Sequence, residues 1–511
     1  MRLITAIPAL TALAMFALPA MAAEGDPDRG EEIYLKRCVW CHGDEGDGLG
    51  PAAERLNPPP RDFTLGQYKI KSVVFDWDYA SDNDIFRMID KGMPGTAMPE
   101  WGDVLEDQEI WDLVIYLKTF AGIEEEEPGA AIDYGKQVET SEQSIAEGKR
   151  LFHDNDRCSE CHGAEGRGDA IKRLKGDNGE RTWPRNLTKP WTFRASTDPK
   201  DIFTRTSTGI PGTQMPNFAD PKSKKKLTIE ERWHVANYVV SLTGTGAPVR
   251  AEKTVIKAVR LEGALPDAPD DPRWAEAEPA TFYLVPQIIV KDRFFTPSND
   301  TISVRAFYNG ETLAMLLEWD DRTKSIPGDA KAQEIADPGM GQDMVAVQLP
   351  IAVPTSTKKP YFIRGDAALP VNLWQWSSGA TDEPETISLV NAHGLENMED
   401  RDAAAIGLTA RGAWDKGTWR VVMTRPLAAG DAETDLQFTE GEFIPVAFSA
   451  WDGSNSETGT KHTLTTWYWL LLEPPTGAKP FVAAIVAMLL IALGEIWWVR
   501  SAAARRREDE E

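Results

Sequence analysis

The spacing of apolar residues predicts helices in the first half of the chain. Near residues 110 and 230 apolar side chains recur every three or four positions, as on the buried face of an amphipathic helix. They are Ile110, Trp111, Val114, Ile115 and Leu117 in the first segment and Trp233, Val235, Ala236, Tyr238 and Val239 in the second. Thr228 and Glu231 have the spacing of a capping box, which predicts that the second helix begins there.

Residues 281–474 follow a different pattern, with short runs rich in β-branched and aromatic residues. TISVRAFY and ETLAMLLEW flank Asn309-Gly310, which is a strong signal for a hairpin turn. Further strands are predicted at 343–349, 371–376, 418–423 and 444–451. No long helical period competes in this region, so we expect a β-sandwich.

Apolar stretches at the two ends predict export and a membrane anchor. Residues 1–22 begin Met-Arg, continue through an apolar run and end in Ala-Met-Ala, as a secretory signal peptide does. Residues 480–499 are long enough to span a bilayer and contain one charged side chain, Glu495. A buried core helix fits this stretch poorly, because a charged tail, 500–511, follows it. The arginines of that tail predict a cytoplasmic C-terminus, a single pass through the cytoplasmic membrane and a periplasmic bulk.

Length and charge narrow the class of protein. A chain of 511 residues is typical of about three domains. Its mean hydropathy of -0.37 fits soluble domains and excludes a polytopic membrane protein. The net charge of -25 repels phosphate backbones, so no nucleic-acid partner is expected.

An internal repeat organises the first half. CVWCHGDEGDG at 38–48 returns as CSECHGAEGRG at 158–168, and KGMPGTAMPEW at 91–101 returns as TGIPGTQMPNF at 208–218. We therefore expect two copies of one helical domain, at 24–122 and 141–245. An acidic linker at 123–140, which contains four consecutive glutamates, would join them, and a Pro- and Ala-rich linker at 246–280 would follow.

The repeated C-x-x-C-H runs point to covalent haem. They contain all four cysteines, which are Cys38, Cys41, Cys158 and Cys161. On one helical turn the two thiols can form thioethers with the haem vinyl groups, while His42 or His162 binds iron from the same face. A zinc site would need further ligands, and a redox dithiol would not need the histidine. Met98 and Met215 are the candidates for the second iron ligand, because Met93 has Ile210 as its counterpart.

With these motifs, residues 24–245 resemble two tandem class I c-type cytochrome domains. The resemblance implies two small all-α domains with two covalent haem c groups and one-electron transfer. A di-haem peroxidase would require one iron without a methionine, and both copies carry one.

The β region resembles the haem-b-binding γ subunits of ethylbenzene dehydrogenase and related enzymes of the dimethyl sulfoxide reductase superfamily. The motifs are DMVAVQLP at 343–350, PYFIRGD at 360–366, PVNLWQW at 370–376, Trp451-Asp452-Gly453 and Lys461 before Trp467. The family holds haem b between a methionine and a lysine, which implies Lys461 as one iron ligand. Arg364 stands where the methionine is expected and would pair with a haem propionate. The substitutes for the missing ligand are His393, ranked first, then Met340 and Met344.

The resulting hypothesis is a membrane-anchored, periplasmic electron-transfer subunit, not itself an enzyme. It would relay electrons between molybdenum and iron–sulfur oxidoreductase subunits and a soluble cytochrome c or a terminal oxidase. The chain shows no Gly-rich nucleotide loop, nucleophile signature or metalloprotease run. Two alternatives stay open: a di-haem cytochrome with a haem-free β-sandwich for binding or docking, and an accessory subunit of a Rieske and cytochrome b complex.

Overall fold

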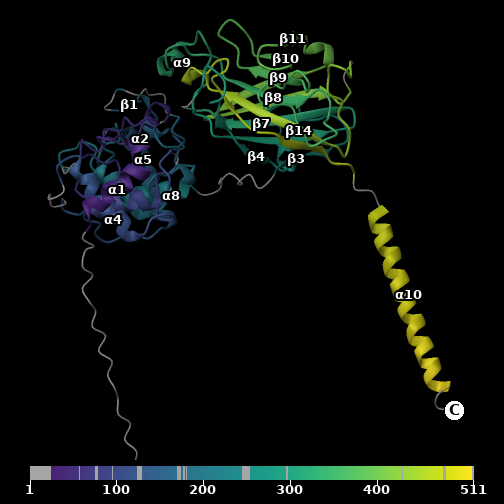
Figure 1. The fold of residues 1–511 in the computed structure, drawn as a ribbon, viewed down its shortest axis with the longest axis horizontal. Helices are drawn as coiled ribbons and strands as arrows, with labels where there is room; N and C mark the ends of the chain where they lie inside the picture. The colour runs from purple at the N-terminus through teal and green to yellow at the C-terminus, as the bar shows by residue number, and fades with distance from the viewer. Residues whose placement is uncertain are drawn as a thin grey trace, which may run out of the picture. The chain divides into compact units, whose positions relative to one another are not determined.

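The structure is a computed structural model that describes residues 25–56, 58–74, 79–94, 96–123, 129–169, 174–176, 179, 181–243, 254–294, 297–428, 430–475 and 479–508. The predicted signal peptide and the four consecutive glutamates of the first linker lie outside the described residues. The chain forms two compact units, residues 1–247 and residues 248–511, which are considered separately below (Figure 1).

The first unit is helical, and its two copies repeat one arrangement. Copy one contains α1 (Pro27–Arg37), α2 (Val39–His42), the 3-10 helix η1 (Ala53–Arg55), α3 (Asp82–Lys91) and α4 (Asp107–Thr119). Copy two contains α5 (Glu142–His153), η2 (Asp154–Asp156), α6 (Ser159–His162), β1 (Leu174–Lys175), β2 (Arg181–Thr182), η3 (Pro190–Thr192), α7 (Pro199–Thr208) and α8 (Ile229–Leu242). The predicted helix start at Thr228 is confirmed, because its hydroxyl accepts the Glu231 N–H at 3.2 Å while Glu231 Oε2 accepts the Thr228 N–H at 2.8 Å.

The first and last helices of each copy cross at a glycine. A Cβ on Gly30 of α1 would collide with the carbonyl oxygen of Asp112 in α4, and a Cβ on Gly148 of α5 would collide with that of His234 in α8. Only glycine permits so close an approach of two backbones. The apolar faces expected from the sequence meet around these crossings, with Ile110, Leu113 and Val114 buried in α4.

Salt bridges and hydrogen bonds join the two copies directly. Arg87 of α3 donates from both terminal nitrogens to the carboxylate of Asp201 in α7, at 2.6 and 2.5 Å. Arg205 of α7 reaches back into copy one and donates to the carbonyl oxygens of Lys71 at 2.6 Å and Lys69 at 3.3 Å. A bidentate Arg–carboxylate pair fixes orientation as well as distance, so the copies are held in one arrangement.

The second unit contains a 14-stranded sheet in the order β11-β10-β9-β8-β14-β16-β3-β6-β7-β13-β12, with β4, β5 and β15 beside this path. The strands are β3 (Val255–Arg260), β4 (Ala280–Tyr283), β5 (Val285–Pro286), β6 (Thr301–Tyr308), β7 (Thr312–Asp320), β8 (Met344–Pro350), β9 (Val371–Ser377), β10 (Thr386–Ala392), β11 (Met398–Arg401), β12 (Thr409–Asp415), β13 (Thr418–Pro426), β14 (Phe443–Trp451), β15 (Thr463–Leu464) and β16 (Tyr468–Leu472). Short helices η4 (Pro272–Glu276), α9 (Ala330–Ile335), η5 (Ala404–Ile406) and η6 (Gly453–Asn455) lie in the connections.

Alternate residues of the strands form one core between two layers. Val345 and Val347 of β8 and Trp374 of β9 share this core with Met315 of β7 and Val421 of β13. Strand β14 pairs with β8 in one layer and with β16 in the other. The period of two along each strand places the intervening residues on the outer face, and the arrangement is the one expected of a β-sandwich.

The described part of the predicted linker at 246–280 contains two elements of the β unit, β3 and η4. Residues 255–260 form β3, which pairs in parallel with β16 on one side and with β6 on the other. Its side chains alternate between buried and more exposed positions, with Ile256 and Ala258 completely buried. The strand was not predicted because the proline, alanine and charged residues around it give the whole segment the composition of a linker.

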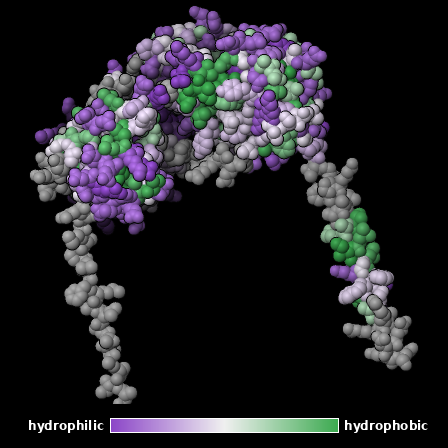
Figure 2. All heavy atoms as spheres, in the orientation of Figure 1, coloured by the Kyte–Doolittle hydropathy of each residue, from purple (hydrophilic) through white to green (hydrophobic). Residues whose placement is uncertain are grey.

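Helix α10 (Lys479–Glu508) follows β16 and contains the expected apolar stretch. Residues 485–502 have a mean hydropathy of 1.6, and none of this window is buried (Figure 2). By length and composition it is the one described helix able to cross a membrane. The helix continues to Glu508, so the described part of the predicted tail is helical.

Candidate functional site

The two C-x-x-C-H runs adopt the same local structure. In each run the last four residues form one helical turn, α2 or α6, which ends at Gly43 or Gly163 with a positive φ of 80° or 78°. His42 Nδ1 donates to the carbonyl oxygen of Arg61 at 3.0 Å, and His162 Nδ1 donates to that of Arg185 at 3.0 Å. Since the carbonyl accepts the Nδ1 proton, Nε2 of each ring carries the lone pair that a metal requires.

Burial favours the uncharged forms of Cys38, Cys158 and His42. It raises the pKa of the Cys38 and Cys158 thiols to about 12 and lowers the pKa of His42. A redox dithiol needs a thiol pKa below its ordinary value. The electrostatics therefore disfavour the redox-dithiol alternative, while a neutral imidazole is the form that binds iron.

The loops around the two predicted methionine ligands are also alike. Thr96 donates to the carbonyl oxygen of Met93 at 2.7 Å and accepts the Met98 N–H at 3.1 Å. Thr213 donates to the carbonyl oxygen of Ile210 at 2.8 Å and accepts the Met215 N–H at 3.2 Å. Met98 and Met215 thus occupy equivalent positions, and both side chains are half-buried.

A separate cavity lies on the outer face of the β unit, and Arg364 lines it. The inner residues of the cavity come from β8, β9, β14 and β15, and the loop residues Phe362, Ile363 and Arg364 cover it. Gln348 of β8 holds this loop, because its side chain donates to the Phe362 carbonyl at 2.9 Å and accepts the Arg364 N–H at 3.0 Å. Nearby, Val371, Val390, Ala392 and Ala447 form an apolar cluster on the outer face.

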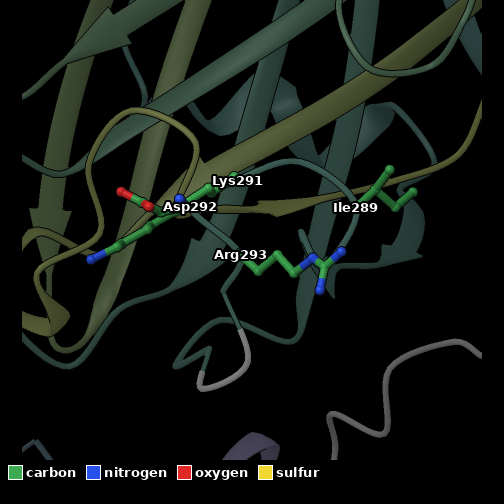
Figure 3. Close-up of a pocket in the computed structure, with 5 residues that line it drawn as sticks. Ile289, Lys291, Asp292 and Arg293 are labelled. Carbon is green, nitrogen blue, oxygen red and sulfur yellow. The ribbon is translucent and has the colours of Figure 1, made fainter.

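The other residues predicted to ligate haem b do not line this cavity. Lys461 is exposed and lines a different, open hollow together with Ile289, Lys291, Asp292 and Arg293 (Figure 3). Lys461 therefore lies among charged side chains at the surface and outside the cavity that Arg364 lines. Among the described lining residues of the cavity, His393, Met340 and Met344 are likewise missing.

The cavity contains a histidine that the sequence analysis missed. His462 is 5% exposed, and its ring lies 4.6 Å from that of Trp451, centroid to centroid. Burial, with a contribution from the Arg364 charge, lowers the pKa of His462 to about 4, so the ring is neutral at pH 7. One sequence feature could have pointed to His462: it comes directly before the short strand β15. In a strand, consecutive side chains point to opposite faces of the sheet.

Three buried carboxylates form a second cluster in the same unit. Asp321, Asp343 and Asp452 each bring an oxygen within 4.8 Å of the others, close enough to share a metal ion. Burial is the largest cause of the raised pKa of Asp321 and of Asp343, and the pKa of Asp343 rises to about 7. These residues do not line the cavity that contains His462.

Twin helical domains that each carry a C-x-x-C-H turn, followed by a β unit, are the features expected of a multihaem c-type cytochrome. Comparison with protein-family models agrees. Residues 25–117 match "Cytochrome C oxidase, cbb3-type, subunit III", residues 145–243 match "Cytochrome c", and residues 271–405 and 393–463 match "Ethylbenzene dehydrogenase". The resemblances drawn from the motifs are therefore confirmed for both parts of the chain.

Two curated relatives share parts of the chain. A protein of Haloferax mediterranei, described as a respiratory nitrate reductase haem subunit, is 27% identical over 38% of this chain and 64% of its own length. The chlorate reductase γ subunit of Ideonella dechloratans is 26% identical over 48% of this chain and 99% of its own. Thus the chain covers less than two thirds of the first relative but almost all of the second.

Among solved structures, a chain of the reducing HAO-like protein complex of Kuenenia stuttgartiensis is 35% identical. The match covers 43% of this chain and 97% of that chain, with a TM-score of 0.40.

Proposed function

We propose that this chain is the multihaem electron-transfer subunit of a molybdenum oxidoreductase complex. The observation that carries the proposal is the combination, in one chain, of two haem c domains with a domain of the ethylbenzene dehydrogenase family. The relatives described as nitrate and chlorate reductase haem or γ subunits support it. The chain itself performs no substrate chemistry in this role.

His42 and His162 would bind the two haem c irons through Nε2, with Met98 and Met215 on the opposite faces. The fixed tautomers of the histidines and the matching loops of the methionines support this assignment. Cys38, Cys41, Cys158 and Cys161 would hold the porphyrins covalently. Bound haem would supply one-electron exchange.

The β unit would hold a third haem, of type b, and its match to the ethylbenzene dehydrogenase family model supports this assignment. The cavity beside Arg364 does not fit that macrocycle as it stands, because its volume is about 20 Å³ and Gln348, Gln375 and Ser449 also line it. Helix α10 would anchor the chain in the cytoplasmic membrane, with its arginine-rich end in the cytoplasm and both units in the periplasm.

Purification of the complex from native membranes tests the function. We expect the chain to co-purify with a molybdenum-containing subunit and an iron–sulfur subunit, and its haems to be reduced or reoxidised when the substrate of that partner is added. Co-purification with a Rieske protein and a cytochrome b instead would contradict the proposal and favour the quinol-oxidising alternative.

A further inference from the structure

Three aspartates at strand ends of the β unit form a buried cluster that the proposed function does not use. Asp321 follows β7, Asp343 precedes β8 and Asp452 follows β14. Strands β8 and β14 pair in one layer of the sandwich, with Met344 opposite Trp451, whereas β7 pairs with β6 and β13 in the other layer. The three carboxyl groups therefore come from both layers and meet at one end of the sandwich.

The cluster concentrates negative charge in the interior of the β unit. Asp321, Asp343 and Asp452 are 2%, 0% and 4% exposed, and an oxygen of each lies within 4.8 Å of the others. Glu457 is completely buried beside them, and its Oε2 accepts the Asp452 N–H at 3.1 Å. The ion pairs among the described residues of this unit include none of these four carboxylates. Buried charges are normally paired with an opposite charge or bound to a metal.

One oxygen of the cluster also lacks a hydrogen bond. Asp321 Oδ1 accepts the N–H of Thr323 at 3.1 Å and its hydroxyl at 3.2 Å, whereas Asp321 Oδ2 is buried without a partner among the described residues. This oxygen belongs to the carboxyl group that faces Asp343 and Asp452. A buried acceptor without a partner is unfavourable unless something else occupies it, and a cation within the cluster would do so.

Uncharged groups supply the hydrogen bonds that the cluster does receive. They are backbone N–H groups, hydroxyls and one indole, and their residues are Gly453, Ser325 and Trp419 for Asp343, Ser454 and Ser298 for Asp452, and Thr323 for Asp321. Another buried aspartate of the unit is bound differently, because Arg401 donates to Asp435 Oδ1 at 2.6 Å. The described side chains thus balance the charge of Asp435 but not the charge of the cluster.

The ligand set selects a hard cation. The cluster contains carboxylates alone, without a histidine or a cysteine among the described residues. Oxygen ligands suit Ca²⁺ and Mg²⁺, whereas Zn²⁺ and copper prefer nitrogen and sulfur. Ca²⁺ binds oxygen at about 2.4 Å, so one ion can join oxygens up to about 4.8 Å apart. Mg²⁺ binds at about 2.1 Å and retains several waters, which suits a buried site less well.

We propose that Asp321, Asp343 and Asp452 bind one Ca²⁺ ion, which fastens the two layers of the sandwich together at this end. The ion occupies Asp321 Oδ2 and balances the buried charge. Asp343 and Asp452 belong to two motifs noted in the sequence, at 343–350 and 451–453, and the site gives their carboxyl groups a role. The site is structural and does not depend on whether the β unit holds haem b.

The test uses the full chain in detergent, stripped with a chelator and exchanged into metal-free buffer near neutral pH. Titration calorimetry with Ca²⁺ should show one tight site per chain, above weak binding to the acidic surface. Asp321→Asn keeps the size of the side chain but removes a charged ligand, so it should weaken the tight site at least about tenfold. Asp435→Asn is the matched control, since it alters a buried aspartate outside the cluster and should retain the tight site.

Hydrogen exchange gives a second readout next to the site, because the amides of Ser325 and Gly453 donate to the Asp343 carboxylate. Ca²⁺ should slow the exchange of these amides in the wild type and not in Asp321→Asn. Stripped wild-type protein without a tight Ca²⁺ site would overturn the proposal even if Asp321→Asn does not fold. Equal affinity in Asp321→Asn and the wild type would also overturn it, and tighter binding of Mg²⁺ than of Ca²⁺ would overturn the choice of ion.

Discussion

The carbonyl oxygens of Arg61 and Arg185 act on the haem motifs through single hydrogen bonds. Each accepts the Nδ1 proton of the motif histidine at 3.0 Å. Such a bond sets the tautomer, the ring orientation and the basicity of an iron ligand. Because the donor is a side chain and the acceptor is backbone, substitution of either arginine leaves the bond itself intact.

The ligand on the other face of each iron gives the first prediction. Met98→Leu should lower the potential of one haem by on the order of 0.1 V, within the ~0.8 V range that axial ligands span, because a thioether favours ferrous iron. A potentiometric titration would measure this change together with the loss of the sulfur-to-iron absorption band. Met93→Leu is the matched control, and an equal shift in that variant would show that the wrong methionine was chosen.

The buried carboxylates predict how stability depends on pH. Burial, together with the charge of Asp452, raises the pKa of Asp343 to about 7, whereas an aspartate in an unfolded chain titrates near ~3.9. The folded state therefore binds more protons than the unfolded state between these values. Stability is greatest below the unfolded pKa and falls as pH rises through the folded one.

We expect calorimetry of the β unit, in the presence of a chelator, to show a transition temperature that decreases from about pH 4 to pH 7. Asp321→Asn removes one buried carboxyl whose pKa is raised, so it should flatten this slope and raise stability at neutral pH. The same slope in Asp321→Asn as in wild type would contradict the explanation.

The close crossing of α1 and α4 predicts that stability is sensitive to the size of the side chain at the crossing point. Gly30→Ala would force α1 away from the Asp112 carbonyl of α4, at a cost of about 1–3 kcal/mol for overpacking. This exceeds the gain of ~0.5–1 kcal/mol that alanine brings to a helix. Chemical denaturation of the first unit would measure the loss of stability. The exposed neighbour Glu31 provides the control, since Glu31→Ala should change stability by less than about 0.5 kcal/mol.

Elements with a strong local pattern could be predicted from the sequence, and those fixed by distant partners could not. The strands predicted within 301–319 and at 343–349, 371–376, 418–423 and 444–451 are present, and so is the capped helix at 229–242. Strand β3 has six residues and gains its place from β6 and from β16, the latter more than two hundred positions later. No local rule anticipates such a pairing.

The cavity on the outer face of the β unit also depends on contacts between distant segments, which local sequence patterns do not show. Arg364 was found through its motif, whereas the burial of His462 depends on the packing of β14, β15 and the loop over them. Sequence reasoning could not separate two adjacent residues, Lys461 and His462, by the surfaces that they reach.

For the whole molecule, α10 is the only described part with the composition of a membrane span. A chain that stops after Pro475 lacks this helix but keeps both haem motifs. We expect it to appear in the soluble periplasmic fraction with two covalent haems, which fractionation and mass spectrometry would show. Retention in the membrane fraction would mean that a partner subunit, and not α10, holds the protein there.

The parallel pairing of β3 with β16 also has a mechanical consequence. Chain from the cytochrome unit enters the β unit at the start of β3, and chain leaves toward α10 at the end of β16. Because the two strands run in the same direction, with Trp469 opposite Val255 and Leu472 opposite Ala258, tension between these points would load their hydrogen bonds along the strand axes. The bonds must then break together in shear rather than one after another. The β unit is thereby built as a tether that resists extension.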